Sequence, residues 1–349
     1  MVANVMVRYR TVNRREFIGT TGVAGVGFLG GCLNADTAGG DNELVMVSSG
    51  EETGTYASSQ GIAGTVNQNT EDVFIDARPS GGTDDNVGMM NRGEADIGYF
   101  QHNSAQLIME GKEPYDAIDF TPLQLFHHSD LAWLFVTSNS GWESVTDIES
   151  NSKVSPTPSG SGSAPVLEQA LNYAVDDYER VSYGFGAQSS AMQEGELDVA
   201  TIAISNFDFE SSWIQEMKQT VDTRILGWPN DAVQEIGDDS LVPAEEFDLS
   251  EDLAEGYAYV PDPTVAINIP YNYCTHDGVP YDPVYEMLNV MWENREAMAD
   301  THVYEEYLLE DEWWVTRMYD GVPFHPAAAD FYEEQGLWRD EFERGEVNE

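Results

Sequence analysis

Two glycine-rich loops carry the residues whose types and spacing could bind an anion. They cover residues 50–56 (GEETGTY) and 159–163 (SGSGS), and each lies between a predicted strand and a predicted helix. The first N–H groups of a helix lack internal partners and carry partial positive charge. Glycine lets the backbone approach a ligand closely, so such loops can hold a carboxylate or phosphate without lysine or arginine. The alternative is that both loops only cap their helices.

Polar residues at the ends of neighbouring predicted strands extend this candidate site. In an α/β sheet, loops at the carboxyl ends of strands meet ligands where the strand order reverses. For Thr53, plain helix capping is an equally good explanation. The predicted ligand-binding residues are Thr53, Gly54, Thr55, Tyr56, Ser80, Gly81, Gly82, Thr83, Gln101, Asn103, Ser161, Gly162, Ser163 and Ser205.

Several conspicuous side chains are explained better without a ligand. Arg78 could pair with a ligand carboxylate, but an intramolecular salt bridge is favoured among so many acidic residues. His127 and His128 are adjacent on a predicted strand, so they point to opposite faces, and no joint metal site is expected. Trp313 and Trp314 are interpreted as packing residues. The acidic pairs are interpreted as solvated faces: Glu305-Glu306 and Asp311-Glu312.

No catalytic motif is recognisable in the sequence, which has no G-x-S-x-G, H-E-x-x-H or C-x-x-C pattern. With 63 acidic residues, neighbouring carboxylates are expected anywhere and carry little information about catalysis. We therefore predict a binding protein without cofactor or metal rather than an enzyme.

The composition is strongly acidic. Fifteen Lys and Arg residues stand against 63 Asp and Glu, for a formal net charge of −48, which excludes nucleic acid as a partner. Hydrophobic residues make up 41% of the chain, which favours a globular protein over a disordered one. Self-repulsion at this charge weakens a compact state unless salt screens it, and the Debye length is about 3 Å at 1 M. The composition resembles that of halophilic archaeal proteins, and we predict a fold that needs molar salt.

The first 32 residues resemble an export signal. Arg14-Arg15 matches a twin-arginine pattern, and the apolar run that follows is shorter than the roughly 20 residues of a membrane span. Residues 29–32 (LGGC) resemble a lipobox, with Cys32 as the lipidated first mature residue. We predict a signal at 1–31, a tether at 32–42 and anchoring to the outer face of the cytoplasmic membrane through Cys32. Cys274 is then left without a disulfide partner.

Beyond residue 42, short apolar runs alternate with helical patterns, which predicts the α/β class. Roughly 300 residues exceed the comfortable size of one core, so two lobes are expected. Residues 229–263 are poor in periodic pattern. Strands are predicted at 44–49, 73–79, 96–101, 123–126, 131–137, 154–157, 181–183, 199–204, 224–227 and 265–269. Helices are predicted at 56–69, 83–91, 103–110, 164–175, 188–194, 207–220, 284–300 and 303–309.

Six short motifs occur in an order that is similar to one known family. They are GTY at 54–56, SGGT at 80–83, GEADIG at 93–98, SGSGS at 159–163, GELD at 195–198, and PFHPAA at 323–328 with Tyr332 and Gly336. Over about residues 44–340 the chain resembles the TAXI group of solute-binding receptors, which serve tripartite ATP-independent periplasmic (TRAP) transporters. The acidic Glu51-Glu52 pair and Ser163, where Thr is commoner, depart from the family pattern.

This resemblance implies a two-lobed type II periplasmic-binding-protein (Venus flytrap) fold with a hinge of two crossings, near 137–141 and 261–264. Lobe one would cover 43–138 plus 265–349, and lobe two 139–264. The protein would be a monomer that captures a small carboxylate or amino-acid-like solute, glutamate-like in type. It would deliver this solute to the membrane permease subunits of a TRAP transporter. The alternatives are a receptor of an ATP-driven importer or a ligand sensor with the same fold.

Overall fold

The computed structural model describes residues 42–348, with gaps at 52, 159–160 and 238–241. The predicted signal at 1–31, the lipidation site Cys32 and nearly all of the tether at 32–42 lie outside the described residues. Among the residues that are described, no helix has the length and apolar character needed to cross a membrane.

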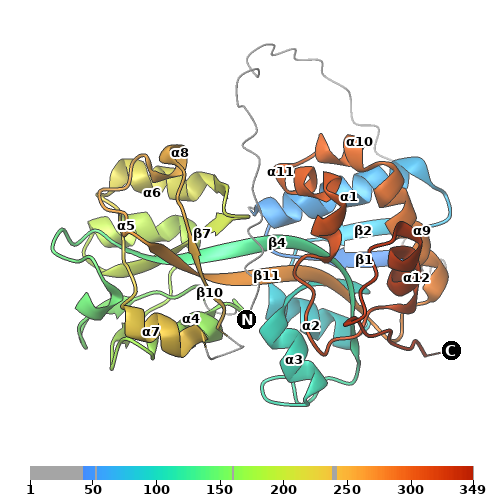
Figure 1. The fold of residues 1–349 in the computed structure, drawn as a ribbon, viewed down its shortest axis with the longest axis horizontal. Coiled ribbons are helices and arrows are strands. Elements are labelled where there is room, and N and C mark those ends of the chain that lie inside the picture. Colours follow the sequence, from blue (N-terminus) through green and yellow to red (C-terminus); the bar gives the residue numbers. More distant parts are fainter. Residues whose placement is uncertain (1–41, 52, 159–160, 238–241, 349) are drawn as a thin grey trace, which may run out of the picture. The chain divides into compact units, whose positions relative to one another are not determined.

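One mixed sheet of eleven strands organises the described part of the chain (Figure 1). The strands are β1 Glu43–Val47, β2 Phe74–Arg78, β3 Ile97–Gln101, β4 Pro122–Thr137, β5 Lys153–Val154, β6 Glu179–Arg180, β7 Val199–Ser205, β8 Phe209–Glu210, β9 Arg224–Ile225, β10 Ala244–Phe247 and β11 Thr264–His276. The order is β2-β1-β3-β11-β4-β7-β5-β6, with β10 beside β11, β8 beside β7 and β9 beside β4. Pairs of β1 with β2 and β3, and of β5 with β6 and β7, are parallel.

Two long strands join the two ends of this sheet. The predicted strands at 123–126 and 131–137 form the single 16-residue strand β4, and the predicted strand at 265–269 extends to the 13 residues of β11. The two strands pair along their length, β11 continues to β3 on one side, and β4 continues to β7 on the other. The separation expected at 127–130 was wrong because these polar residues are buried in the strand, where other segments supply their partners.

Helices cover the sheet in two groups (Figure 1). We call the elements around β1, β2 and β3 the first lobe, and those around β5, β6 and β7 the second lobe. The predicted two-lobed α/β fold is thus confirmed, while the residue bounds of the lobes stay a prediction. First-lobe helices are α1 Gly54–Asn69, α2 Thr83–Asn91, α3 His102–Met109, α9 Tyr281–Glu293, α10 Arg295–Ala299, α11 Val303–Glu306 and α12 Pro326–Gln335. Second-lobe helices are α4 Ala164–Leu171, α5 Gln188–Gln193, α6 Ser212–Thr220, α7 Asn230–Gly237 and α8 Glu251–Ala254.

Several predicted elements are shorter or divided. The helix expected at 207–220 begins only at Ser212, because Asn206 and Phe207 have φ angles of 50° and 57°, outside the helical region, before β8. The helix expected at 284–300 is divided at Asn294 into α9 and α10. The helix expected at 164–175 ends at Leu171, the strand expected at 181–183 is replaced by β6, and residues 229–263 contain α7, β10 and α8.

Helix α12 was missed, although the sequence marks both of its ends. Pro326 occupies its first position, where the missing N–H costs nothing. Gly336 ends it in the left-handed conformation, with φ of 73°, as glycine commonly does. Its buried Ala327–Ala329 run and Phe331 pack in the main core beside α9.

Candidate functional site

The first glycine-rich loop caps α1 and packs against α11. Thr53 Oγ1 accepts a hydrogen bond from the Tyr56 N–H at 3.2 Å and donates to Gly50 O at 2.7 Å, which is the capping role. Gly54 lies so close to Tyr304 that a Cβ on it would be 3.3 Å from the tyrosine ring. The Tyr56 hydroxyl accepts from Gln60, so this side chain is engaged along its own helix.

The second glycine-rich loop meets the first lobe directly. Gly162 O accepts a hydrogen bond from Gln101 Nε2 at the end of β3. A Cβ on Gly162 would lie 2.8 Å from Gln101 Nε2 and 3.0 Å from Thr83 Cβ, so a larger residue here would force both side chains to shift. Ser163 Oγ and Tyr271 OH are 2.8 Å apart, and Tyr271 OH donates to Gln101 Oε1 at 3.1 Å.

A second polar junction joins Ser205, at the end of β7, to Tyr304 of α11. Their hydroxyls are 2.9 Å apart, and the Tyr304 hydroxyl also bonds to Thr55 in the first turn of α1. The Phe209 ring packs edge-on against Tyr304 at 5.1 Å between centroids. Tyr304 therefore links the beginning of α1 to the second lobe.

Four buried tyrosines, which we call the tyrosine cluster, connect these junctions: Tyr99, Tyr271, Tyr273 and Tyr304. Tyr99 stacks on Tyr271 with 4.5 Å between ring centroids. Burial raises the pKa of Tyr271 and of Tyr304 to about 12, so their hydroxyls remain protonated near neutral pH. The site thus presents neutral hydroxyl donors.

Beneath Tyr304, a buried carboxylate contradicts our interpretation of Glu305 as part of a solvated face. Glu305 is 0% exposed, whereas its neighbour Glu306 is exposed. Ser58 donates to Glu305 Oε1, and Ser58 Oγ lies 2.7 Å from His128 Nε2. Burial raises the pKa of Glu305 to about 7 and lowers that of His128 to about 3. The acidic pattern at 305–306 gave no sign that the chain turns one carboxylate inward.

The three side-chain types of a hydrolase triad thus meet here, but in another arrangement. In a triad, histidine stands between serine and the carboxylate and accepts the serine proton. In this cluster Ser58 stands between His128 and Glu305, with its hydroxyl oxygen in contact with both side chains. The order of the three side chains therefore differs from that of a hydrolase triad.

The remaining predicted residues lie at the edges of these junctions. Ser80 Oγ accepts from the Gly82 N–H at 3.2 Å, and the Gly81 N–H donates to Asp85 at 2.9 Å, so this turn organises the start of α2. Asn103 lies in the first turn of α3 and Ser161 in the second glycine-rich loop, both half-buried.

The other side chains weighed from the sequence are placed as follows. Arg78 forms the expected intramolecular pair, with Asp76 at 2.7 Å. His128 contacts Ser58, whereas His127 Nδ1 contacts Asn272, so the two adjacent histidines have separate partners.

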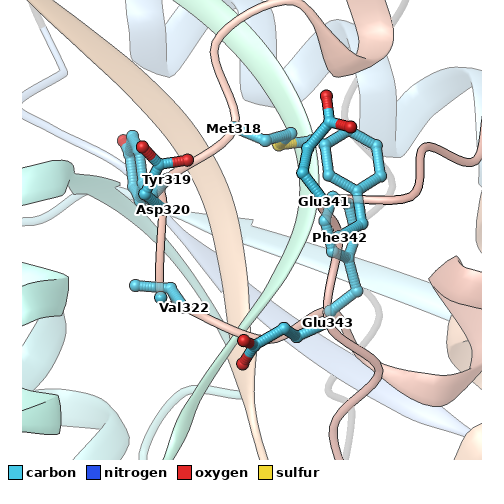
Figure 2. Close-up of a pocket in the computed structure, with 9 residues that line it drawn as sticks. Met318, Tyr319, Asp320, Val322, Glu341, Phe342 and Glu343 are labelled. Carbon is cyan, nitrogen blue, oxygen red and sulfur yellow. The ribbon is translucent and has the colours of Figure 1, made fainter.

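Two hollows on the molecule do not coincide with the candidate site. Figure 2 shows the smaller one, of about 20 Å³, where the carboxylates of Asp320, Glu341 and Glu343 lie around it. A cavity of this size holds about one water molecule. The larger, of about 360 Å³, is lined by three more acidic residues, Asp72, Asp282 and Glu286. Carboxylates repel an anion, so neither hollow suits an anionic solute.

Sequence reasoning missed Tyr271, Tyr304, Ser58 and Glu305. A partial signal existed for Tyr271, because Ile269, Tyr271 and Tyr273 continue the alternation of the predicted strand at 265–269. No local signal marked Ser58 and Glu305, which are brought together from positions far apart in the chain.

Comparison with solved structures finds distant likenesses to solute-binding proteins. A putative L-cystine ABC transporter protein from Listeria monocytogenes is 10% identical, with 76% of this chain and 98% of that chain covered and a TM-score of 0.46. A TctC solute binding protein from Polaromonas is 12% identical, with 74% and 86% covered and a TM-score of 0.43. A probable amino-acid ABC transporter extracellular-binding protein from Bacillus subtilis is 10% identical, with 76% and 99% covered and a TM-score of 0.45. These likenesses are too distant to transfer a ligand or a residue role.

The family assignment comes from the sequence itself. No curated protein matches this chain. A model of one protein family, however, matches residues 47–336, which contain both glycine-rich loops, β4, β11 and the tyrosine cluster. The chain therefore belongs to the NMT1-like family.

Proposed function

We propose that this protein is an extracytoplasmic solute receptor that captures a small carboxylate or amino-acid-like solute between its two lobes. It delivers the solute to the permease subunits of a TRAP-type secondary transporter, and lipid on Cys32 holds it at the outer face of the membrane. One observation carries the proposal. Second-lobe Gly162, Ser163 and Ser205 contact first-lobe Gln101, Tyr271 and Tyr304 through hydrogen bonds between neutral polar groups.

Polar contacts of this kind suit a junction that opens and closes. A hydrogen bond between neutral groups contributes only about 1 kcal/mol net, because water can replace either partner. The hydroxyls of Ser163 and Ser205 can therefore leave Tyr271 and Tyr304 at low cost and donate to a solute instead. An apolar junction of the same size would resist opening and would offer nothing to a polar solute.

The chemistry of these groups favours a negatively charged or zwitterionic solute. Tyrosine and serine hydroxyls and the Gln101 amide are neutral donors, and burial keeps the tyrosines protonated. Such donors hold an anion without lysine, and the whole chain has only three lysines, Lys112, Lys153 and Lys218.

Calorimetry on the full chain in 3 M salt tests the proposal, after mass spectrometry has identified small molecules released from the purified protein. L-Glutamate is the first probe. Gly162→Ala should weaken binding about tenfold or more, equivalent to about 1.4 kcal/mol, because the added Cβ meets Gln101 and Thr83 and prevents closure.

The matched control is Gly237→Ala at the end of α7, where a Cβ would have nothing within 4 Å. It should bind as the wild type does. A wild-type protein that releases no small molecule and binds no carboxylate or amino acid would refute the receptor function. Equal binding by Gly162→Ala would place the solute elsewhere.

A further inference from the structure

A series of hydrogen bonds runs from the buried Glu305 carboxylate to the tyrosine cluster. Ser58 Oγ contacts Glu305 Oε1 and lies 2.7 Å from His128 Nε2. The other ring nitrogen, His128 Nδ1, lies 3.3 Å from Ser129 Oγ, and the Ser129 hydroxyl bonds in turn to that of Tyr99. We call these residues the Glu305 network: Glu305, Ser58, His128, Ser129 and Tyr99. All of them are buried, and they come from α11, α1, β4 and β3.

Two histidines are the titratable groups closest to the Glu305 carboxylate. Oε1 lies 3.9 Å from His128 Nε2, and Oε2 lies 3.7 Å from His302 Nδ1. Tyr273 and Tyr304 also face this carboxylate, but burial raises the pKa of both hydroxyls, so they stay neutral near pH 7. With no proton on Glu305 beyond neutral histidines, the group carries one negative charge. After uptake of one proton, on whichever side chain, it carries none.

Charged groups on the elements packed against α11 are engaged elsewhere. Helix α1 contains no Asp, Glu, Lys, Arg or His. On α10, Arg295 pairs with Asp311 at 2.9 Å, and Glu296 is exposed. In the short helix that follows α11, at residues 307–309, the Tyr307 hydroxyl donates to Asp208. The two histidines are therefore the groups with which Glu305 can share a proton.

A carboxylate at Glu305 orients the network in one direction. An unprotonated carboxylate only accepts hydrogen bonds, so Ser58 must donate to it and must itself accept from His128 Nε2. A neutral ring that donates from Nε2 has a bare Nδ1, which accepts from the Ser129 hydroxyl. Ser129 then accepts from Tyr99. The hydrogen of the Tyr99 hydroxyl is thus used inside the network.

One added proton reverses this direction. A protonated Glu305 donates to Ser58, which then donates to His128 Nε2. His128 Nδ1 now carries the ring hydrogen and donates to Ser129, and Ser129 donates to the Tyr99 oxygen. A proton on His128 instead of Glu305 gives the same orientation at Ser129, because both ring nitrogens then donate. In either case the hydrogen of the Tyr99 hydroxyl is released from the network.

Both ends of the network adjoin the candidate solute site. At one end, Tyr99 stacks on Tyr271 with 4.5 Å between ring centroids. At the other end, Glu305 directly follows Tyr304, whose hydroxyl bonds to Ser205 of the second lobe. A negative charge on Glu305 therefore lies beneath the groups proposed to hold an anion, and it repels that anion. Because the carboxylate is buried, even molar salt screens the repulsion only weakly.

We propose that the Glu305 network is a proton-binding site, and that capture of an anionic solute is coupled to the uptake of one proton by this network. The inference rests on the proposed receptor function. An anion favours the protonated network for two reasons: the negative charge beneath the site is removed, and Tyr99 gains a hydrogen to donate. Coupling is reciprocal, so the solute raises the proton affinity by the same factor as the proton raises the solute affinity.

Affinity for an anion should fall as pH rises. Burial raises the pKa of Glu305 to about 7, so the solute-free protein loses the proton as pH rises through 7. A bound anion stabilises the protonated form and raises this pKa further. Between pH 6 and pH 8 we therefore expect the Kd of an anionic solute to increase about tenfold, a usual size for coupling between two sites.

Calorimetry on the full chain in 3 M salt tests the coupling, with L-glutamate as the probe because its net charge is nearly constant between pH 6 and pH 8. Titrations in HEPES and in Tris, which differ in heat of ionisation, give the number of protons taken up. The wild type should take up about half a proton per solute at pH 7.5. Glu305→Gln should take up none, and its Kd should be the same at pH 6 and pH 8.

Glu306→Gln is the control, because this neighbouring carboxylate is exposed, and it should keep both the pH dependence and the proton uptake. If Glu305→Gln does not fold, the wild-type uptake alone decides. Binding without proton uptake, or uptake that persists in Glu305→Gln, would overturn the coupling and leave the receptor function standing. If L-glutamate does not bind, the small molecule released from the purified protein replaces it. A protein that binds no carboxylate or amino acid would overturn the receptor function and the coupling together.

Discussion

The tyrosine cluster and a second group, which we call the Asp130 cluster, lie on opposite faces of β4 and β11. The Asp130 cluster consists of His127, Asp130, Asn206, Asn268 and Arg317, and its chemistry differs from that of the tyrosine cluster. The first consists of neutral hydroxyls that are paired with partners from both lobes, such as Ser163 with Tyr271. The second contains a buried carboxylate, a guanidinium and four atoms without partners. The hydroxyls of the tyrosine cluster can therefore exchange one hydrogen-bond partner for another, whereas the charged groups of the Asp130 cluster cannot.

The reason is the difference in free energy between breaking a neutral hydrogen bond and breaking a buried ion pair. A neutral hydroxyl that loses its partner returns to water at a net cost of about 1 kcal/mol. A buried charge that loses its partner is left in a poor solvent, at a cost of about 3–5 kcal/mol. We therefore expect the face of the tyrosine cluster to open for a solute, and the face of the Asp130 cluster to stay closed.

Arg317→Ala is the strongest test of this contrast. It leaves the 1%-exposed Asp130 carboxylate without its cation, and we expect the free energy of unfolding to fall by about 3 kcal/mol or more. Urea denaturation in 3 M salt measures it. The control Arg339→Ala breaks a surface pair in which Glu312 is 74% exposed, and it should cost under about 1 kcal/mol. If Arg317→Ala and Arg339→Ala lower the free energy of unfolding equally, the Asp130 cluster is not held by a buried ion pair and the contrast with the tyrosine cluster is lost.

Glu305→Gln, in the buried site beside Tyr304, should change the free energy of unfolding in a pH-dependent way. The folded pKa of Glu305, about 7, lies above its ordinary value of 4.5, so its stabilising contribution is complete below about pH 4.5 and is lost as pH rises through 7. As pH rises from 5 to 8, the free energy of unfolding of Glu305→Gln should therefore increase relative to that of the wild type by up to about 3 kcal/mol.

Urea denaturation at both pH values measures this difference. The lowered pKa of His127 acts with the opposite sign, but it is common to both proteins and cancels. His128 and His302 lie 3.9 Å and 3.7 Å from the Glu305 carboxylate, so any change in their titration is part of the measured difference. Glu306→Gln, at the exposed neighbour, should show no such trend. A flat difference for Glu305→Gln would mean that the carboxyl group is not held in an apolar setting.

Tyr304→Phe should have the smallest effect. It removes the hydroxyl bonds to Ser205 and Thr55 but keeps the ring contact with Phe209, and we expect a loss of about 2 kcal/mol in the free energy of unfolding. Tyr285→Phe, whose hydroxyl bonds to Glu334 on the surface, serves as the matched control. A loss as large as that of Arg317→Ala would show that the tyrosine cluster is as fixed as the Asp130 cluster.

Local patterns in the sequence predicted the parts of the fold that local interactions determine. Helix α2 has the predicted bounds Thr83–Asn91, because Gly82, with φ of 112°, and two acidic residues mark its start. Residues 127–130 were left outside the two strands predicted at 123–126 and 131–137. They continue β4 because Ser58, Asn272 and Asn206 supply partners from distant segments, and no local pattern contains that information.

The candidate site was predicted in part for the same reason. Backbone-determined positions such as Gly162 and the helix start at Thr83 could be read from loops and caps, and the predicted start of α1 at residue 56 is two residues late. Tyr271 and Tyr304 could not, because an aromatic residue in a strand or a short helix is most often ordinary core. The binding roles of all fourteen predicted residues stay a prediction.

A crystal structure of the protein with the solute that it carries through purification tests the central claim most directly. The account predicts that oxygens of the solute lie within hydrogen-bond distance of the hydroxyls of Ser163 and Ser205, with Gly162 closing over them. A solute bound instead in the larger acidic hollow beside Asp72 and Glu286, with the Ser163–Tyr271 contact intact, would contradict it.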